Sequence, residues 1–432
     1  MPELQRTPEE RLLLARAATV LPGGTLGNVR LDDDYAFVVK EGRGSHIWDM
    51  SGNEYVDYLL GSGPMVMGHA NPKVIAAAEE AMHKGTTFFT QNPYAIELAE
   101  RIVEAIPCAE QVRYTSTGTE ATSYALRVAR AYRRRDKILK FEGGFHGMHD
   151  YSLMSLSPTG SIPFPNPEPS SAGIPKAIQD TVLVAPYNDL DATVAIIEQN
   201  HNDLAAVIVE PVQRILAPLP GFLEGLREVT SRFDIPLIFD EVVTGFRMAY
   251  GGAQQYYGVI PDLAAIGKIV GGGFPLAGVV GRKELMDVYD ANAVDSGDFL
   301  PQVGTLNGNP VAAAAGLATL EIMRAPGLYE AYWETGGRLR NGLQQMLDEA
   351  EIPATVSGID IMFDVYFTDA PITGYRSTLN ADKSKNKVFD EALMENGVFK
   401  PPGKVYVGIC HDEADVQQTL AAFQAGVDAL RD

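Results

Sequence analysis

Cysteine is scarce in this chain of 432 residues, which contains only Cys108 and Cys410. Two cysteines do not build a disulfide framework, and so few of them are typical of a protein in a reducing cytoplasm. No group of cysteines and histidines has the spacing of metal ligands, so we expect no metal site. The chain is therefore expected to be cytoplasmic and to depend on neither disulfides nor a metal.

Long apolar runs and an excess of positive charge are also missing. Glycine, proline or charge interrupts every hydrophobic stretch before it reaches transmembrane length, and the N-terminal Met-Pro-Glu-Leu-Gln-Arg lacks a signal-peptide core. The 35 basic and 56 acidic residues leave a net charge of −21, which argues against nucleic acid and anionic membranes as partners. With 46% hydrophobic and 21% charged residues, the chain is expected to be a soluble globular protein with an acidic, solvated surface.

Strands and helices alternate through residues 70–315, which predicts an α/β fold with a mostly parallel sheet. The strand expected at 204–210 is apolar up to its last residue, Glu210, as expected of a strand covered on both faces. From about residue 326 the pattern restarts as a separate, smaller α/β unit. We therefore predict an N-terminal segment, 1–65, that joins the small domain, a large domain, 66–322, and a C-terminal small domain, 323–432.

One lysine, Lys268, lies between an apolar run and the three glycines 271–273. Apolar surroundings favour the neutral amine, which is the form that attacks a carbonyl. Upstream, the apolar strand 236–239 leads to Asp240, and a buried carboxylate there needs a cationic partner. A lysine that forms a Schiff base and an aspartate that holds a pyridinium nitrogen together describe a pyridoxal 5'-phosphate (PLP) site.

A third feature is the turn Thr117-Gly118-Thr119, between the strand expected at 112–116 and the helix expected at 120–133. Backbone N–H groups at a helix N-terminus bind anions, and glycine lets a phosphate approach closely. The two threonines add hydroxyl donors. This turn is therefore the candidate phosphate site, with Thr117, Gly118 and Thr119 as its ligands.

These residues lie in six segments that follow one another in a family order over roughly residues 20–320: STGTEAT, KFEGGFHG, IVEPV, LIFDEVVTGFR, GGAQQYYGVIPDLAAIGKIVGGGFPLAGVVGR and GTLNGNP. Through them the chain resembles a class III aminotransferase of fold type I, closest to the glutamate-1-semialdehyde aminomutase-like branch. The resemblance implies a large PLP-binding domain with a mostly parallel, seven-stranded type of sheet flanked by helices, plus a smaller α/β domain. It also implies a homodimer with active sites at the interface.

The resemblance assigns further roles around the cofactor. Phe145 would stack on the ring, His146 would position its neighbours, and Val242 would pack on the face opposite Phe145. Glu210 would lie beside the cofactor, and Thr305 would bind the phosphate of the partner subunit's site. Lys268 and Asp240 are the expected catalytic pair.

Substrate contacts are expected from three segments. Arg30 belongs to a loop that resembles the aminomutase substrate loop, where the matching arginine meets a carboxylate; the alternative is a surface arginine. Ser62 lies in a segment that resembles the lining of the substrate pocket. Residues 157–175, rich in serine, proline and glycine, resemble a mobile gating loop, and a passive linker is the alternative.

The C-terminal segment 400–411 departs from the aminomutase pattern, because it has no glutamate and Lys404 stands near the expected place. We therefore predict an aminotransferase that moves an amino group between an amino acid (a β- or unusual α-amino acid) or an amine and a keto acid. The alternatives are glutamate-1-semialdehyde 2,1-aminomutase, a decarboxylase of the same fold and a non-catalytic binding protein. A dinucleotide site is excluded, because no Gly-x-Gly-x-x-Gly follows an early strand.

Overall fold

Two compact units make up the chain in the computed structural model, which describes residues 6–27, 31–292, 297, 299–400 and 402–431. The smaller unit contains residues 1–71, 330–369 and 381–432, and the larger contains 72–329 and 370–380. The divisions fall shortly after the expected boundaries 65/66 and 322/323. The sequence did not predict that residues 370–380 return to the larger unit, where Arg376 pairs with Glu142.

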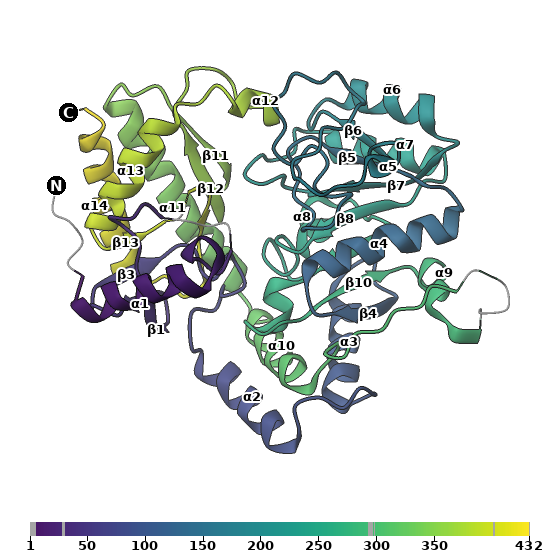
Figure 1. The fold of residues 1–432 in the computed structure, drawn as a ribbon, viewed down its shortest axis with the longest axis horizontal. Helices are drawn as coiled ribbons and strands as arrows, with labels where there is room; N and C mark the ends of the chain where they lie inside the picture. The colour runs from purple at the N-terminus through teal and green to yellow at the C-terminus, as the bar shows by residue number, and fades with distance from the viewer. Residues whose placement is uncertain (1–5, 28–30, 293–296, 298, 401, 432) are drawn as a thin grey trace. The chain divides into compact units, whose positions relative to one another are not determined.

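A seven-stranded sheet forms the centre of the larger unit (Figure 1), in the order β4-β10-β9-β8-β7-β5-β6. Neighbours pair in parallel from β9 to β6, and only β10 runs antiparallel to both of its neighbours. The sheet is thus mostly parallel, as predicted. Its strands are β4 (Gln111–Thr115), β5 (Lys137–Phe141), β6 (Val182–Ala185), β7 (Leu204–Val209), β8 (Leu237–Glu241), β9 (Leu263–Ile266) and β10 (Ala277–Gly281).

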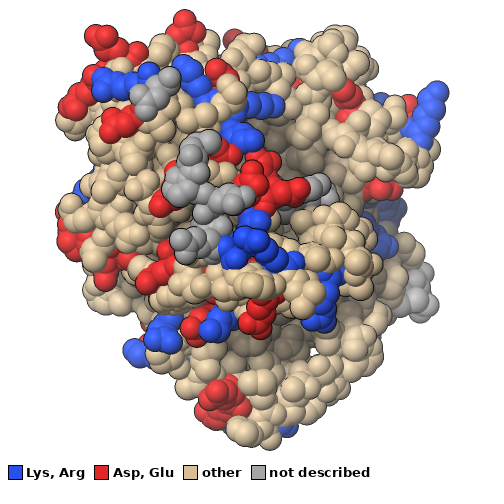
Figure 2. All heavy atoms as spheres, turned by 60° about the vertical axis from the view of Figure 1, so that its left-hand side comes forward, with Lys and Arg blue, Asp and Glu red and all other residues tan. Residues whose placement is uncertain are grey.

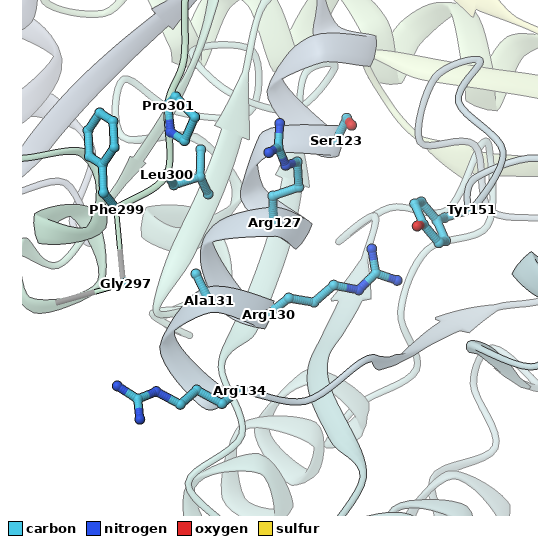
Figure 3. A pocket seen from close by; sticks show the side chains of 10 residues that line it. All are labelled: Ser123, Arg127, Arg130, Ala131, Arg134, Tyr151, Gly297, Phe299, Leu300 and Pro301. Carbon is cyan, nitrogen blue, oxygen red and sulfur yellow. The ribbon is translucent and has the colours of Figure 1, made fainter. Parts of the chain in front are cut away.

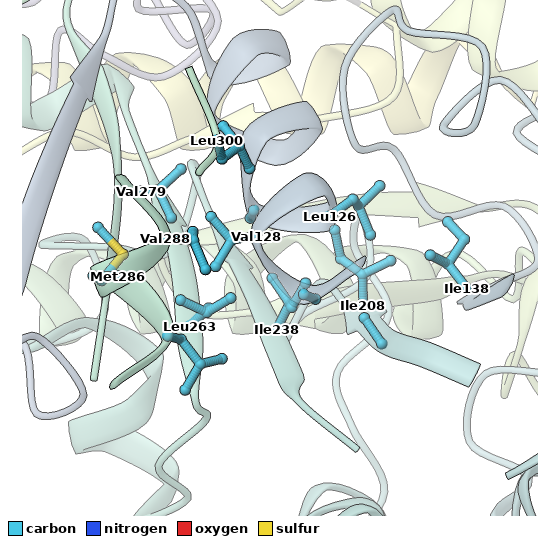
Figure 4. Close-up of a cluster of buried hydrophobic side chains, with 14 of the residues drawn as sticks. Leu126, Val128, Ile138, Ile208, Ile238, Leu263, Val279, Met286, Val288 and Leu300 are labelled. Atoms are coloured by element: carbon cyan, nitrogen blue, oxygen red, sulfur yellow. The ribbon is translucent and has the colours of Figure 1, made fainter. Parts of the chain in front are cut away.

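Helices cover this sheet, and every residue of β7 and β9 is buried in consequence. Apolar side chains of one helix, α4, meet those of the sheet in the cluster shown in Figure 4, where Leu126 and Val128 approach Ile208, Ile238 and Val279. Full burial of such side chains contributes roughly 1.5–3 kcal/mol each. The helices are α2 (Pro72–Lys84), α3 (Pro93–Ala105), α4 (Gly118–Arg133), α5 (Lys176–Gln179), α6 (Leu190–Asn200), α7 (Phe222–Arg232), α8 (Gly252–Tyr257), η2 (Lys268–Gly271), α9 (Lys283–Met286), η3 (Asp287–Tyr289), α10 (Pro310–Met323) and α12 (Tyr375–Thr378).

The smaller unit combines two sheets with four longer helices. One sheet has the order β1-β2-β3-β13 and the other β11-β12-β14. The strands are β1 (Val39–Arg43), β2 (His46–Asp49), β3 (Glu54–Asp57), β11 (Thr355–Ile359), β12 (Met362–Tyr366), β13 (Val398–Phe399) and β14 (Val405–Tyr406). The helical elements are α1 (Pro8–Val20), η1 (Pro22–Gly24), α11 (Leu328–Glu349), α13 (Lys383–Glu395) and α14 (Glu413–Ala429).

Acidic and basic side chains are interspersed on the face that Figure 2 shows. Exposed ion pairs among the described residues include Lys84 with Glu80 (2.7 Å) and Arg338 with Glu413 (2.7 Å). Such pairs contribute little to stability, because water screens them. Within the described ranges no single helix is long and apolar enough to cross a membrane; α10 and α11, bent by 82°, pass that test only when taken together.

The serine- and proline-rich segment 157–175 forms no helix or regular strand, as predicted, and α12 contacts it. Arg376 donates to both carboxylate oxygens of the buried Glu142 (2.8 and 3.0 Å) and to the carbonyl of Ile162 (2.6 Å). The guanidinium also lies 4.2 Å from the ring centroid of Phe164. Tyr375 adds a hydrogen bond to the carbonyl of Pro158 (3.0 Å). The segment is thereby anchored at several points within the larger unit; its role as a lid remains a prediction.

A buried lysine organises the loop that follows β5. Lys140 is fully buried, and its ammonium donates to the carbonyls of Gly144 (3.0 Å), Ser152 (2.7 Å) and Met154 (2.6 Å). Three acceptors match the three N–H donors of an ammonium. Burial lowers the pKa of Lys140 to about 7, and the charge of Glu210 opposes that shift. One side chain therefore ties both ends of the loop 144–154 to the sheet.

We expect Lys140→Met to lower the free energy of unfolding by about 2–4 kcal/mol, because three buried carbonyls lose their donor. The folded-state pKa of Lys140 lies below its ordinary value of 10.5, so the unfolded chain binds more protons between pH 7 and 10.5. Stability from this group therefore rises with pH in that window. Denaturant unfolding should show that the difference in free energy of unfolding between wild type and variant increases from pH 7 to pH 9.

The matched control is Lys137→Met on the same strand, where the lysine forms a partly exposed pair with Asp203 (3.0 Å). We expect only a small loss of stability there, because water screens a partly exposed ion pair. An equal pH response in the two variants would contradict the role of Lys140.

Candidate active site

The predicted cofactor residues of the larger unit follow the carboxyl ends of five strands. Strand β10 is antiparallel to both β4 and β9, so β4 points the same way as the parallel strands β5, β7, β8 and β9. The carboxyl ends of all five therefore lie along one edge of the sheet. In open α/β sheets ligands bind outside this edge. The residues at or after these ends are Thr117–Thr119 (β4), Phe145 and His146 (β5), Glu210 (β7), Asp240 (the last residue but one of β8) and Lys268 (β9).

Lys268 stands two residues after β9, at the start of the short helix η2. Its φ of 51° is in the left-handed region, which costs a non-glycine residue roughly 1–3 kcal/mol. The side chain is half-buried, while Ile269 and Val270 behind it are fully buried. At the end of η2, a Cβ on Gly272 would lie 2.7 Å from the carbonyl oxygen of Ala315, so only glycine lets α10 pack there. The lysine is thus held in a strained conformation by a close-packed support.

Asp240 is paired with His146, a residue of the loop that follows β5. Nδ1 of His146 is 2.8 Å from Oδ2 of Asp240, and the two residues are 2% and 6% exposed. The other oxygen, Oδ1, accepts the backbone N–H of Val242 (3.1 Å). A carboxylate partner orients an imidazole through an N–H donor, so Nδ1 carries the proton while Asp240 is ionised. His146 therefore orients the Asp240 carboxylate; its cationic partner, which the sequence predicts to be the ring nitrogen of the cofactor, remains a prediction.

The phosphate turn is the N-terminus of α4, a helix of 16 residues. Thr117 is its N-cap: the hydroxyl accepts the N–H of Glu120 (3.2 Å), and the carboxylate of Glu120 accepts the N–H of Thr117 (2.9 Å). This capping box orders the turn. Gly118 and Thr119 are the first helical residues, whose N–H groups have no carbonyl partner within a helix. These groups and the positive end of the helix dipole suit an anion.

Val242 joins three of these strand ends. A Cβ on Gly118 would lie 2.9 Å from a methyl group of Val242, and a Cβ on Gly267, just before Lys268, would lie 3.2 Å from the same group. Both positions therefore favour glycine, because a side chain would displace the valine. The phosphate turn, the Asp240 strand and the lysine loop accordingly close around one apolar side chain.

Glu210 and Phe145 form a second junction. The backbone N–H of Phe145 donates to Oε2 of Glu210 (2.8 Å), and Glu210 is buried. A charge-assisted hydrogen bond of this kind fixes the peptide that carries the aromatic ring. The structure thus places Glu210 behind Phe145; a direct contact of Glu210 with the cofactor remains a prediction.

The β5 loop also closes onto α4. Thr122 donates to the carbonyl of His146 (2.6 Å), and the hydroxyl of Thr119 accepts the N–H of Met148 (3.2 Å). A Cβ on Gly147 would lie 2.6 Å from Cα of Thr119, so glycine is required at this contact. The predicted ring-stacking, phosphate and aspartate residues are therefore linked by direct contacts.

Three predicted residues stand apart from this group. Arg30 lies outside the described residues. Ser62 belongs to the smaller unit, where it has a φ of 68°. Thr305 is exposed, and its neighbour Asn307 accepts a hydrogen bond from Ser116, next to the phosphate turn (3.3 Å). The substrate and partner-subunit roles of these three residues remain predictions.

Sequence reasoning missed Lys140, Gln213 and Arg214. Gln213 is buried and donates to the carbonyl of Glu142 (2.8 Å), and the guanidinium of Arg214 lies 5.4 Å from the ring centroid of Phe145. A lysine within an apolar strand was a visible signal for Lys140. No local pattern marked the other two, since their contacts join residues far apart in the chain.

A hollow of about 700 Å³ lies on the outer side of α4, away from the phosphate turn (Figure 3). Arg127, Arg130 and Arg134 line it, and Figure 3 shows their side chains pointing in different directions. Arg130 lies over the ring of Tyr151 (4.0 Å) and donates to the carbonyl of Asp136 (2.8 Å). None of the predicted site residues lines this hollow. Nor do any three histidine, cysteine or acidic side chains of the described residues cluster as metal ligands.

The donor set at the strand edge fits PLP. The N-terminus of α4 suits a phosphate dianion, the Asp240 carboxylate suits a protonated ring nitrogen, and the Lys268 amine suits an aldehyde. Phe145 and Val242 add apolar side chains to this donor set; that they lie on opposite faces of the cofactor ring remains a prediction. The close contact of Gly118 with Val242 brings the anion site and the carboxylate strand together without intervening side chains.

Comparison with known proteins agrees with this geometry. The model of the family Aminotransferase class-III matches residues 29–420. Two glutamate-1-semialdehyde 2,1-aminomutases are similar over their whole length: that of Methanothrix thermoacetophila (41% identical, covering 96% of this chain and 95% of the relative) and that of Syntrophomonas wolfei (42% identical, 96% of each). The crystal structure of an omega-transaminase from Sphaerobacter thermophilus superimposes with a TM-score of 0.92 (36% identical, covering 98% of each chain).

The family match covers most of the chain, and the site contains the groups that the family's cofactor requires. The chain therefore belongs to the class III aminotransferases, the α/β enzymes of fold type I that use PLP.

Proposed function

We propose that this enzyme is a glutamate-1-semialdehyde 2,1-aminomutase, which moves an amino group within one substrate. The observation that carries this proposal is the full-length identity of about 40% to relatives of that name. The comparisons thus favour the alternative over the intermolecular aminotransferase that the sequence first predicted. The strand-edge site supports amino transfer in general, since both reactions need the same cofactor residues.

PLP, when bound, supplies an aldehyde for the substrate amine and a ring that accepts electrons. Lys268 Nζ is the base that takes a proton from the carbon beside the substrate amine and returns it at the product carbon. Asp240 holds the proton on the ring nitrogen, which keeps the ring electron-poor. His146 fixes the carboxylate of Asp240 by the 2.8 Å contact, and the α4 N-terminus binds the phosphate.

Two features make an intermolecular aminotransferase the second candidate. Lys404 occupies the region where the aminomutase resemblance leads us to expect a glutamate, and it is a buried residue whose ammonium lies 5.5 Å from the ring centroid of Tyr406. The similar Sphaerobacter structure is also named an omega-transaminase. A substrate amino acid and a keto acid would then react in turn.

The remaining expectations belong to this proposal. A homodimer would bring Thr305 to the partner subunit's phosphate site, and Arg30 and Ser62 would contact the substrate. The segment 157–175 would act as the lid. Residence in the cytoplasm also stays a prediction.

The deciding experiment gives purified PLP-loaded enzyme glutamate-1-semialdehyde without any amino donor or acceptor. We expect 5-aminolaevulinate to accumulate over many turnovers, because the amino group never leaves the enzyme–substrate pair. Product would be followed by chromatography. If the semialdehyde is stable but a keto acid enables steady turnover of an amino acid, the second candidate replaces the first.

We expect Asp240→Asn to lower kcat by about 10²–10⁴-fold, because a neutral amide does not stabilise a proton on the ring nitrogen. Asp262→Asn is the matched control. Asp262 is also a buried carboxylate, paired with Arg227 (2.7 Å) and Arg282 (3.1 Å), but it precedes β9 at the opposite edge of the sheet. Asp262→Asn should lower the free energy of unfolding and leave kcat unchanged. Steady-state kinetics that show equal losses in both variants would contradict the assignment of Asp240.

A further inference from the structure

A tight turn after β7 places an arginine in a conformation that suits glycine. The N–H of Gln213 donates to the carbonyl of Leu216 (2.9 Å), and the N–H of Leu216 donates back to the carbonyl of Gln213 (2.8 Å). Arg214 and Ile215 are therefore the two central residues of a hairpin-like turn. Arg214 has a φ of 59°, and the first central position of such turns usually holds glycine, asparagine or aspartate.

The rest of the turn is fixed by burial. Gln213, Ile215 and Leu216 are 1%, 2% and 5% exposed, and the amide of Gln213 donates to the carbonyl of Glu142 (2.8 Å). Arg214 is the exposed residue among these buried neighbours. The turn thus presents one long cationic side chain on a buried, hydrogen-bonded base. The same burial leaves the backbone of Arg214 little freedom to relieve its strain.

This side chain extends toward the predicted cofactor-stacking residue. The Cζ atom of Arg214 lies 5.4 Å from the ring centroid of Phe145, within the range of a cation–π contact. Phe145 is itself held by Glu210 and is only half-buried. Within the described part of the chain, no Asp or Glu oxygen forms an ion pair with Arg214, although the protein carries 21 more acidic than basic residues. The guanidinium is therefore available to an anion beside the ring.

We propose that Arg214 is a specificity residue that binds the carboxylate of the amino substrate. The inference rests on the proposed function, because both candidate reactions place an amino compound next to Phe145. A guanidinium presents a planar fork of donors that matches a carboxylate, and a cation beside the ring of Phe145 selects substrates that carry a negative charge. Glycine would satisfy the turn without strain, so the arginine has a role that offsets its conformational cost.

The test uses Arg214→Gly in the PLP-loaded enzyme. It compares the wild-type enzyme's best carboxylate-bearing amino substrate with the amine that lacks only that carboxylate. We expect kcat/KM for the carboxylate substrate to fall by about 10–100-fold, as when a charged hydrogen-bonded pair is lost. The value for the plain amine should stay unchanged, and Tm should rise because the turn is relieved. Arg214→Lys should retain part of the preference.

Arg134→Gly is the matched control, because Arg134 is also exposed, has a φ of 53° and caps the far end of α4. Arg134→Gly should raise Tm and leave kcat/KM unchanged for both substrates. Equal losses of kcat/KM for the two substrates in Arg214→Gly would show that Arg214 merely supports Phe145. Unchanged kcat/KM for both substrates would show that Arg214 has no role in catalysis. Either result overturns the proposal.

Binding of glutarate, measured by calorimetry on the wild-type and Arg214→Gly holoenzymes, separates this inference from the proposed function. If the wild type turns over neither candidate substrate, the proposed function fails. Even if the proposed function fails, a fall of about tenfold or more in the glutarate affinity of Arg214→Gly would support a carboxylate site at Arg214. Equal affinity in both proteins would overturn the inference by itself.

Discussion

The direction of five strands is the constraint on which the rest of this enzyme depends. Because β4, β5, β7, β8 and β9 all end at one edge, residues from five distant segments reach the same place. The single antiparallel strand, β10, separates β4 from β9 without reversing either of them. The predicted anion site, a carboxylate and an amine thereby come together at one edge of the sheet.

Close packing then sets how near these groups come. Gly118 and Gly267 approach Val242 so closely that a methyl group on either would displace it, and Gly147 approaches Thr119 in the same way. Glycine at Gly118 and Gly267 therefore permits close contact between strand ends, and Gly147 needs glycine also for its φ of 91°. The strained Lys268 is tolerated for a related reason, since the packed helix behind it leaves no room to relax.

Three buried polar groups complete the arrangement, and each has a specific partner. Asp240 meets His146, Glu210 meets the peptide of Phe145, and Lys140 meets three carbonyls of one loop. A buried group without such a partner would cost more than the hydrogen bond is worth, so these contacts select one conformation of the β5 loop. Arg214 differs from them, because it combines an exposed cation with a strained backbone beside the same loop.

Local pattern was enough to predict the order of strands and helices. It also led to the predictions that Lys268 and Asp240 are the reactive pair and that the turn at Gly118 binds an anion. Apolar runs, glycines and helix caps depend on residues that are close together in the sequence. Predictions of this kind therefore need only local sequence. The resemblance added Phe145, His146 and Val242. Sequence could not show that residues 370–380 return to the larger unit, or that His146 contacts Asp240 across 94 residues of chain. Nor could it show which carbonyls accept from Lys140, or that Arg214 lies over the ring of Phe145. Those contacts exist only once the sheet has aligned its strand ends, so tertiary structure decided them.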